Sequence, residues 1–249
     1  MRKPERSHEE QWCGVTRRTD VSLQKRIIGG QNCDEGERLY HVRLESSYGN
    51  EKIRCGGSLI HPQWILTAAH CWKAETTVAT LNVHPRAVRK QIRVIKYAPQ
   101  MFTLLGQLHD IMLLKLETPV GNVPLAQLPD CSYRLQVGHV VQLAGEGATI
   151  TGPNNQRCER NIEVMRIKSL FLSLQRRLRE EQKTFLFYNI HKYINKIFLQ
   201  GDDGGAVVYN GMIYGVISFG VAYYACQSHA TVTDVCEYLG WIKSTAGLI

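Results

Sequence analysis

Residues 201–220 read GDDGGAVVYNGMIYGVISFG, a glycine-rich turn that leads directly into an apolar hairpin. Two runs rich in valine, isoleucine and tyrosine flank Asn210-Gly211, a dipeptide typical of a two-residue hairpin turn. Ahead of the hairpin, Asp202 and Asp203 stand side by side before a pair of glycines. Functional side chains are often carried on loops that a rigid scaffold holds in place. The stretch therefore predicts a β-hairpin with a functional turn at its start.

Short apolar runs separated by turn residues recur along most of the chain. They read HVRLES, CGGSLI, WILTAA, QIRVIKY, IMLLKL, HVVQLA and AVVYN. This pattern is typical of an all-β sandwich or barrel. Two segments, residues 169–183 and 234–246, have helical spacing instead. Their periodic apolar residues are Leu170, Leu174 and Leu178 in the first, and Val235, Leu239 and Ile242 in the second.

Composition indicates a globular protein. The chain has 249 residues, of which 44% are hydrophobic, with a formal net charge of +8. Residues 165–200 contain eight Lys/Arg against two Glu, and no nucleic-acid motif accompanies them. We therefore interpret the excess as a solvated basic face and expect no nucleic-acid partner. No apolar run approaches the roughly 18 residues that span a bilayer, so we expect no membrane span.

The cysteines and the N-terminus indicate a secreted protein. The eight cysteines are scattered and form no C-x-x-C pair, which argues against structural zinc and favours disulfides in an oxidising compartment. Yet MRKPERSHEEQWCG lacks the hydrophobic core of a signal peptide. Either export is unconventional or Met1 is not the natural start, and we favour the second alternative. Residues 1–26 are polar and basic, end in Lys25-Arg26, and are interpreted as a propeptide-like tail.

Four segments give the chain a family resemblance. In order they are RIIGG at 26–30, LTAAHC at 66–71, DIMLLKL at 110–116 and QGDDGG at 200–205. Together with CGGSLI before the histidine and ISFG after the glycine turn, they resemble the trypsin/chymotrypsin family of serine proteases (peptidase S1). The resemblance covers residues 26–249. It implies a protease domain over 27–249 with two six-stranded antiparallel β-barrels, an active-site cleft between them and a C-terminal helix.

The resemblance assigns a role to each matching residue. His70 matches the general base, and Asp110 matches the carboxylate that fixes the tautomer of that histidine. Gly201 and the amide of Asp203 fall in the turn that stabilises the oxyanion. Ser218 and Gly220 match the strand edge that pairs with the substrate backbone, with phenylalanine between them where the family usually has tryptophan.

The resemblance also implies zymogen activation. Arg26-Ile27 resembles the bond that is cut in the family's precursors, which would free an α-amino group at Ile27. That ammonium would pair with Asp202 and order the oxyanion turn. The alternative is that Lys25-Arg26 is an ordinary exposed basic pair.

At Asp203 the sequence departs from the family motif, which has serine there. A carboxylate has no proton for His70 to take, and its attack on an amide would give a high-energy mixed anhydride. Its charge would also lie where the oxyanion develops. Loss of the nucleophile costs on the order of 10⁶ in turnover. We therefore expect no serine-type hydrolysis, and a raised pKa for His70 between Asp110 and Asp203.

The specificity pocket and residues 165–200 also depart from the family. Ile197 falls at the base of the pocket and Ala230 where a glycine usually leaves room, so trypsin-like specificity is not expected. Residues 165–200 do not resemble the family, and one hypothesis is that they are partly translated intron. The competing hypothesis is a basic amphipathic helix that binds a partner.

Disulfide pairings follow from the resemblance alone. They are Cys55 with Cys71, Cys33 with Cys158, and Cys131 with Cys236. The resemblance leaves open whether Cys13 and Cys226 are free, pair with each other, or link to another chain.

The sequence supports three functional hypotheses. The first is a secreted, monomeric pseudoprotease without cofactor or metal, which binds a protein or peptide in the cleft. The second is an active serine endopeptidase, in which Asp203 or residues 165–200 reflect a fault in the sequence or gene model. The third uses His70, Asp110 and Asp203 as a metal site.

Overall fold

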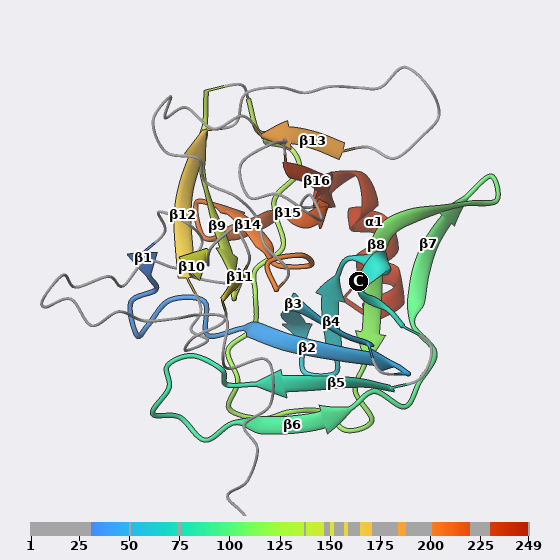
Figure 1. The fold of residues 1–249 in the computed structure, drawn as a ribbon. Helices are drawn as coiled ribbons and strands as arrows, with labels where there is room; N and C mark the ends of the chain where they lie inside the picture. The colour runs from blue at the N-terminus through green and yellow to red at the C-terminus, as the bar shows by residue number, and fades with distance from the viewer. Residues whose placement is uncertain are drawn as a thin grey trace, which may run out of the picture.

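The protein is described from a computed structural model, which covers residues 31–49, 51–73, 76–136, 138–146, 150–151, 157–158, 165–170, 184–187, 201–219 and 230–248. In these residues the chain forms two seven-stranded antiparallel sheets, a two-stranded ribbon and one α-helix (Figure 1). The expected all-β class with a C-terminal helix is confirmed.

The first sheet has the strand order β6-β5-β2-β3-β4-β8-β7. Its strands are β2 (His41–Tyr48), β3 (Glu51–His61), β4 (Trp64–Thr67), β5 (Thr76–Leu81), β6 (Gln91–Val94), β7 (Gln100–Leu104) and β8 (Gln107–Lys115). In β2, Val42, Leu44 and Ser46 are buried while Glu45 is exposed, the alternation of a strand with one face on the core. The run Ile111–Leu114 of β8 is buried throughout.

The first sheet must be strongly curled, because β6 and β7 lie at its opposite edges yet follow each other in sequence. Seven strands in a flat sheet would place these edges about 29 Å apart. The chain between Val94 and Gln100 can span at most about 22 Å. The sheet has seven strands where the resemblance implied six, and β6 and β7 are separate strands with residues 95–99 between them.

The second sheet has the order β1-β12-β9-β14-β15-β16-β13. Its strands are β1 (Gln31–Asn32), β9 (Val140–Gly145), β12 (Met165–Leu170), β13 (Thr184–Phe187), β14 (Ala206–Tyr209), β15 (Met212–Phe219) and β16 (Ala230–Asp234). The short strands β10 (Ile150–Thr151) and β11 (Arg157–Cys158) form the separate ribbon. The seventh strand arises because the two-residue β1 pairs with β12 at the edge.

Two strands fall within the unusual segment 165–200. β12 pairs with β9 over six residues, and β13 pairs with β16. The helix expected over 169–183 is therefore wrong at its start, where Ser169 and Leu170 belong to β12. Pairing with a neighbouring strand outweighs the local helical spacing there. Residues 171–183 lie outside the described residues.

The hairpin expected around Asn210-Gly211 is confirmed. β14 and β15 are antiparallel and joined by these two residues. Both have positive φ, 49° for Asn210 and 80° for Gly211, as a type I′ turn requires. The turn matches the right-handed twist of the strands that it joins.

The C-terminal helix α1 (Val235–Ala246) is also confirmed. The Asp234 carboxylate accepts a hydrogen bond from the Cys236 amide at 2.9 Å and caps the N-terminus, while Gly247 ends the helix with a φ of 68°. The helical spacing predicted that Leu239 would face the core, but Leu239 is only half-buried and Tyr238 is buried instead. Among the described residues, no helix is long and apolar enough to cross a membrane.

Candidate functional site

His70 lies in a short 3₁₀ helix, Ala69–Cys71, that directly follows strand β4. Ala68 and Ala69 are buried, so their small side chains let this turn pack against the core. The disulfide between Cys55 and Cys71, as expected from the resemblance, ties the turn to β3. Strand and disulfide together fix the backbone that carries the His70 ring.

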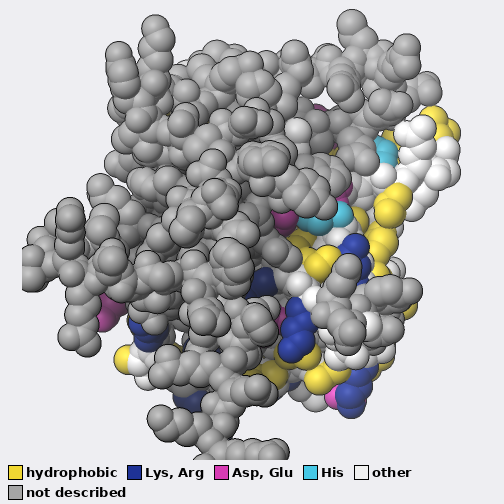
Figure 2. All heavy atoms as spheres, viewed as in Figure 1, with side chains coloured by type: hydrophobic (Ala, Val, Ile, Leu, Met, Phe, Trp, Pro, Cys, Tyr) yellow, Lys and Arg dark blue, Asp and Glu magenta, His cyan; other side chains and the backbone are white. Residues whose placement is uncertain are grey.

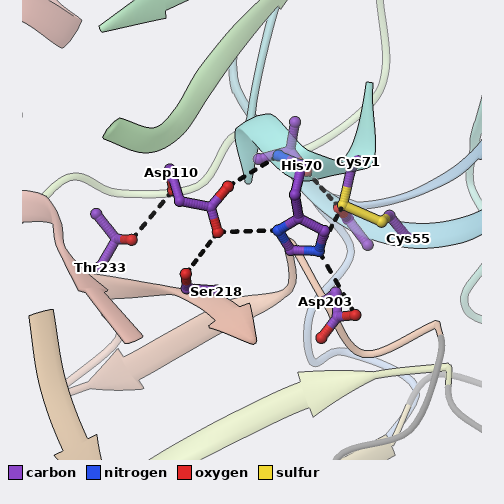
Figure 3. Close-up of polar contacts among 9 residues, drawn as sticks. Cys55, His70, Cys71, Asp110, Asp203, Ser218 and Thr233 are labelled. Carbon is purple, nitrogen blue, oxygen red and sulfur yellow. Dashed lines mark hydrogen bonds and ion pairs between the residues drawn. A yellow bond between two sulfur atoms is a disulfide. The ribbon is translucent and has the colours of Figure 1, made fainter. Parts of the chain in front are cut away.

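Asp110 is buried in β8 and holds His70 through two hydrogen bonds (Figure 3). Its Oδ1 accepts from the His70 backbone N–H at 2.8 Å. Its Oδ2 lies 2.9 Å from the His70 Nδ1 and also accepts a hydrogen bond from the Ser218 hydroxyl. The Thr233 hydroxyl donates to the Asp110 carbonyl at 3.1 Å. A proton on Nδ1 satisfies this arrangement and turns Nε2 toward the turn at residues 201–205.

The site is assembled from both sheets. His70 and Asp110 come from the first sheet, and Ser218 in β15 and Thr233 in β16 come from the second (Figure 3). Ser218 was expected to present its backbone to substrate. The structure shows in addition that its buried side chain supports Asp110. Sequence reasoning missed this contact and that of Thr233, since nothing in their spacing links them to Asp110.

Asp203 lies on the other side of the His70 ring. Its Oδ2 is 3.5 Å from the His70 Nε2, and the two side chains are 20% and 27% exposed. The Gly56 amide, in β3, donates to the Asp203 carbonyl at 2.6 Å and joins the turn to the first sheet. The carboxylate thus occupies the side of the ring that a nucleophile would face (Figure 3).

The glycines of this turn are required by close packing. A Cβ atom on Gly204 would lie 2.3 Å from both the Gly56 carbonyl oxygen and the Thr67 hydroxyl, and its φ is 78°. The Gly204 amide donates to the Ile217 carbonyl at 2.7 Å. Gly201 also has a positive φ, 109°. These contacts fix the position of Asp203 relative to His70.

Asp202 faces the interior instead. It is completely buried, and a Cβ atom on Gly145 would lie 2.1 Å from its Oδ1. Its carbonyl accepts from the Gly205 amide at 3.0 Å. The two adjacent aspartates therefore have different environments, since Asp202 packs against β9 while Asp203 faces the His70 ring.

The two carboxylates change the acidity of His70. Burial alone lowers the pKa of His70, but its hydrogen bonds and charge interactions with Asp110 and Asp203 outweigh burial and raise the pKa to about 9. The ring is therefore an imidazolium at neutral pH. In that state Nε2 carries a proton and has no lone pair with which to accept another.

The geometry does not favour a metal at this site. Asp110 contacts Nδ1 of His70 and Asp203 contacts Nε2, so the two carboxylates lie at opposite ring nitrogens and do not converge. Cys55, His70 and Cys71 are close enough to form a ligand cluster, but the two sulfurs are joined in a disulfide. A disulfide has no thiolate to offer a metal.

The remaining predicted residues divide into described and undescribed ones. The disulfide between Cys131 and Cys236 is present. Ala230 is the first residue of β16, opposite Phe187 of β13. Cys33 is buried, but the Cys158 side chain lies outside the description, so their pairing stays a prediction. Outside the described residues lie Cys13, Arg26, Ile27, Ile197, Gly220 and Cys226.

A two-sheet β fold with a histidine–aspartate pair at the junction of the sheets is the architecture of a chymotrypsin-like hydrolase. The trypsin family model matches residues 27–242. A chymotrypsin-like protease from Macrovipera lebetinus is 34% identical over 232 residues, covering 88% of this chain and 86% of that protein. The chain therefore belongs to the trypsin family.

Other relatives agree with this assignment. Serine protease 1 of Rattus norvegicus is 30% identical over 228 residues, covering 88% of this chain and 89% of that protein. Snake venom serine protease homolog 2 of Macrovipera lebetinus is 30% identical over 234 residues, covering 88% and 86% respectively. The solved structure of neuropsin, a serine protease of mouse brain, has a TM-score of 0.67 with 22% identity and covers 87% of this chain and 98% of its own. At that identity it supports the fold alone.

Proposed function

We propose that the protein is a non-catalytic member of its family, which acts by binding a protein or peptide in the cleft beside His70. The observation that carries this proposal is the Asp203 carboxylate, 3.5 Å from the His70 Nε2, in the place of the nucleophile. The reaction of the family needs a hydroxyl that gives its proton to this nitrogen. Here the group is an acid, and the ring already carries a proton.

Charge is the second reason for inactivity. A developing oxyanion would lie near the amides of Gly201 and Asp203, and there it would be repelled by the Asp203 carboxylate. Oxyanion stabilisation is commonly worth 10²–10³ in turnover. Loss of the nucleophile adds a cost on the order of 10⁶. Each effect alone would remove most of the activity.

The rim of the site supports binding to a polypeptide. The β7–β8 hairpin, whose strand β8 also contains the buried Asp110, has Leu104, Leu105 and Leu108 exposed by 47%, 78% and 51%. Hydrophobic side chains are visible on this projecting hairpin (Figures 1 and 2). Grouped exposed leucines are typical of interaction sites. A protein or peptide ligand with apolar side chains would cover these leucines. We expect this protein to bind the ligand as a monomer.

The same proposal includes secretion and zymogen-like processing. Two disulfides suit an oxidising compartment, and one relative is named as a snake venom protein. Cleavage between Arg26 and Ile27 would free an ammonium group. The buried Asp202 carboxylate supports this step, because a buried acid is the partner that such a group needs.

The second candidate is an active serine endopeptidase. Its support is the intact His70–Asp110 pair, with the buried carboxylate, the Nδ1 contact of 2.9 Å and the Ser218 bond all present. It requires that Asp203 or part of residues 165–200 reflect a fault in the sequence or gene model. Codons for aspartate and serine do not interconvert by a single base change, which counts against a simple error at Asp203.

Labelling with a fluorophosphonate probe after cleavage at Arg26 separates the two candidates. We expect the protein with Asp203 to stay unlabelled, because the probe needs an activated hydroxyl. The variant Asp203→Ser should gain labelling, and the double variant Asp203→Ser/His70→Ala should lose it again. The same labelling is applied to the protein isolated from its natural source, where the endopeptidase candidate expects a serine at position 203. Covalent labelling of that protein at residue 203 would favour the endopeptidase, and its absence would favour the non-catalytic protein.

A further inference from the structure

The segment around β6 presents its apolar side chains to solvent. Residues 85–97 read PRAVRKQIRVIKY. In β6 the usual alternation is reversed, because Ile92 and Val94 are 64% and 50% exposed while Gln91 and Arg93 are half-buried. Val88 and Tyr97, on either side, are 42% and 47% exposed. Single exposed apolar residues are ordinary, but four in one short segment indicate an interaction surface.

The same segment is strongly basic. Residues 84–99 contain no acidic residue and five basic ones, which are Arg86, Arg89, Lys90, Arg93 and Lys96. Lys96 forms an exposed ion pair with Glu117 at 2.8 Å. Within the part of the chain that the structure describes, Arg89 and Lys90 have no acidic partner. The apolar residues of this surface are therefore interleaved with uncompensated positive charge.

The loop that carries these charges is held in place by the protein. The Val88 amide donates to the Pro85 carbonyl at 3.2 Å, and the Asn82 side-chain amide donates to the Arg89 carbonyl at 3.3 Å. His84 Nε2 lies 2.8 Å from the carbonyl oxygen of Asp34 and anchors the start of the loop. A preformed loop loses less conformational freedom when a partner binds.

The position of β6 at the edge of its sheet would allow an extended peptide to pair with it. The strand lies at the edge of the first sheet, and among the described strands it pairs only with β5. His70 follows β4 and Asp110 lies in β8, whereas β6 pairs with β5, so the surface and the cleft are built on different strands. Basic and hydrophobic side chains lie side by side on the lower part of the molecule, where Figure 1 places β5 and β6 (Figure 2).

We propose that residues 86–97, here called the β6 surface, bind an extended acidic segment of another protein whose acidic side chains alternate with apolar ones. Acidic groups complement Arg89 and Lys90, and apolar groups cover Ile92 and Val94. A sulfated polysaccharide or a nucleic acid would use the charges but leave the apolar residues exposed. The exposed edge of β6 suits an extended peptide, which can pair along it.

Binding of synthetic peptides to the full-length protein tests the proposal. The probe is a fluorescent peptide of repeated Asp-Leu-Glu-Phe units, followed by anisotropy at low and high salt. We expect saturable binding that weakens with salt. Neutralising one charge by Lys90→Gln should weaken binding up to about fivefold. The double variant Ile92→Thr/Val94→Thr keeps β-branched residues in the strand and should weaken binding about tenfold or more.

Matched variants separate this surface from general effects. Val140→Thr changes a valine with 51% exposure in β9 of the other sheet, and Lys243→Gln removes one charge from α1. Both should leave binding unchanged, as should His70→Ala, which alters only the cleft. Thermal unfolding of each variant checks that it is folded. Unchanged binding with His70→Ala also keeps this test independent of what occupies the cleft.

Three results would overturn the proposal. The first is no saturable binding of the Asp-Leu-Glu-Phe peptide. The second is equal binding of a peptide with the same acids but no apolar residues, which would make the surface a general polyanion site, as would tighter binding to heparin or to phosphatidylserine vesicles. The third is an equal loss of affinity in Ile92→Thr/Val94→Thr and Val140→Thr.

Discussion

His70 determines what this site can do, because its ring lies between two acids. Asp110 contacts Nδ1 at 2.9 Å and Asp203 lies 3.5 Å from Nε2. One acid orients the ring and supports a positive charge on it, which is useful in catalysis. The second acid further stabilises the positive charge and helps to raise the pKa of His70. Asp203 thus extends the His70–Asp110 pair into a cluster of one histidine and two carboxylates.

The titration of His70 is the most direct check of this arrangement. We expect NMR of the His70 ring to give a pKa of about 9, well above the ordinary value of 6.5. The variant Asp203→Asn should lower that pKa, because it removes the charge at Nε2 but keeps the side-chain shape. His139, which is distant from the cleft in sequence and stacks on Tyr209, serves as an internal reference in both proteins. A His70 pKa at or below 6.5 would contradict the ion cluster.

The same cluster makes stability depend on pH in a defined direction. The folded pKa of His70 is raised, so its stabilising contribution is complete below about pH 6.5 and is lost as the pH rises through about 9. The expected loss is on the order of 3 kcal/mol. Urea unfolding at pH 6 and pH 10 measures it. The difference in free energy of unfolding between the protein and His70→Gln should be larger at pH 6, and a pH-independent difference would contradict the prediction.

At the scale of elements, the turn at residues 201–205 and the hairpin after it form one unit. The Gly204 amide bonds to the Ile217 carbonyl, and the Ile217 amide bonds to the Gly205 carbonyl at 3.0 Å. The turn therefore extends the pairing of β15. Its other contact, from the Gly56 amide to the Asp203 carbonyl, reaches β3 of the first sheet. Asp203 is held by backbone from both sheets.

Two glycines with nearly the same backbone angle test the packing of this turn. Gly204 and Gly211 have φ values of 78° and 80°. A Cβ atom on Gly204 would clash with Gly56 and Thr67, whereas a Cβ atom on Gly211 would have no neighbouring described atom within 4 Å. Gly211→Ala should cost only the backbone strain, about 1–2 kcal/mol. Gly204→Ala should cost about 3 kcal/mol or more, because overpacking adds to that strain. Chemical denaturation measures both, and equal costs would show that packing at Gly204 is unimportant.

At the scale of the whole molecule, a buried ion cluster joins the two sheets behind the site. Glu146, directly after β9, is buried, and its Oε2 accepts a hydrogen bond from the Arg43 Nε, in β2, at 2.5 Å. His41 Nε2 lies 3.3 Å from the Glu146 Oε1. The Glu146 amide donates to the Gly201 carbonyl at 3.3 Å. The cluster therefore connects the first sheet, the second sheet and the turn that holds Asp203.

Removing the charge of Glu146 should weaken the junction of the sheets. Burial raises the pKa of Glu146, but His41 and Arg43 outweigh it and lower the pKa overall. Its contribution is thus present above the ordinary glutamate value and lost as the pH falls through the folded pKa. Glu146→Gln should cost about 3 kcal/mol or more at neutral pH, since it leaves buried positive charge without its partner.

The exposed pair between Glu45 and Arg54 provides the control. The Glu45 side chain is 45% exposed, so Glu45→Gln should cost less than about 1 kcal/mol. Urea unfolding at neutral pH compares the two variants. Similar costs for Glu146→Gln and Glu45→Gln would show that the cluster does not hold the sheets together.

The sequence by itself determined the family, the β architecture, the hairpin, the C-terminal helix and two disulfides. These follow from short motifs and local patterns, which need no knowledge of distant contacts. It also pointed to His70, Asp110 and Asp203, because each lies in a family motif, and the structure brings the three side chains together. Local patterns failed where pairing across a sheet decided the outcome, as at Ser169 and Leu170, which belong to β12 and not to a helix.

Only the tertiary structure decided how the two adjacent aspartates differ and what surrounds His70. Asp202 is buried against Gly145, whereas Asp203 faces the His70 ring, and the backbone of Gly56 helps to hold it there. Ser218 and Thr233 reach Asp110 from strands more than 100 positions further along the chain. The Glu146 cluster and the β6 surface are decided in the same way. The physical reason is that charge and exposure depend on which strands become neighbours, and the two sheets bring together segments that no local pattern connects.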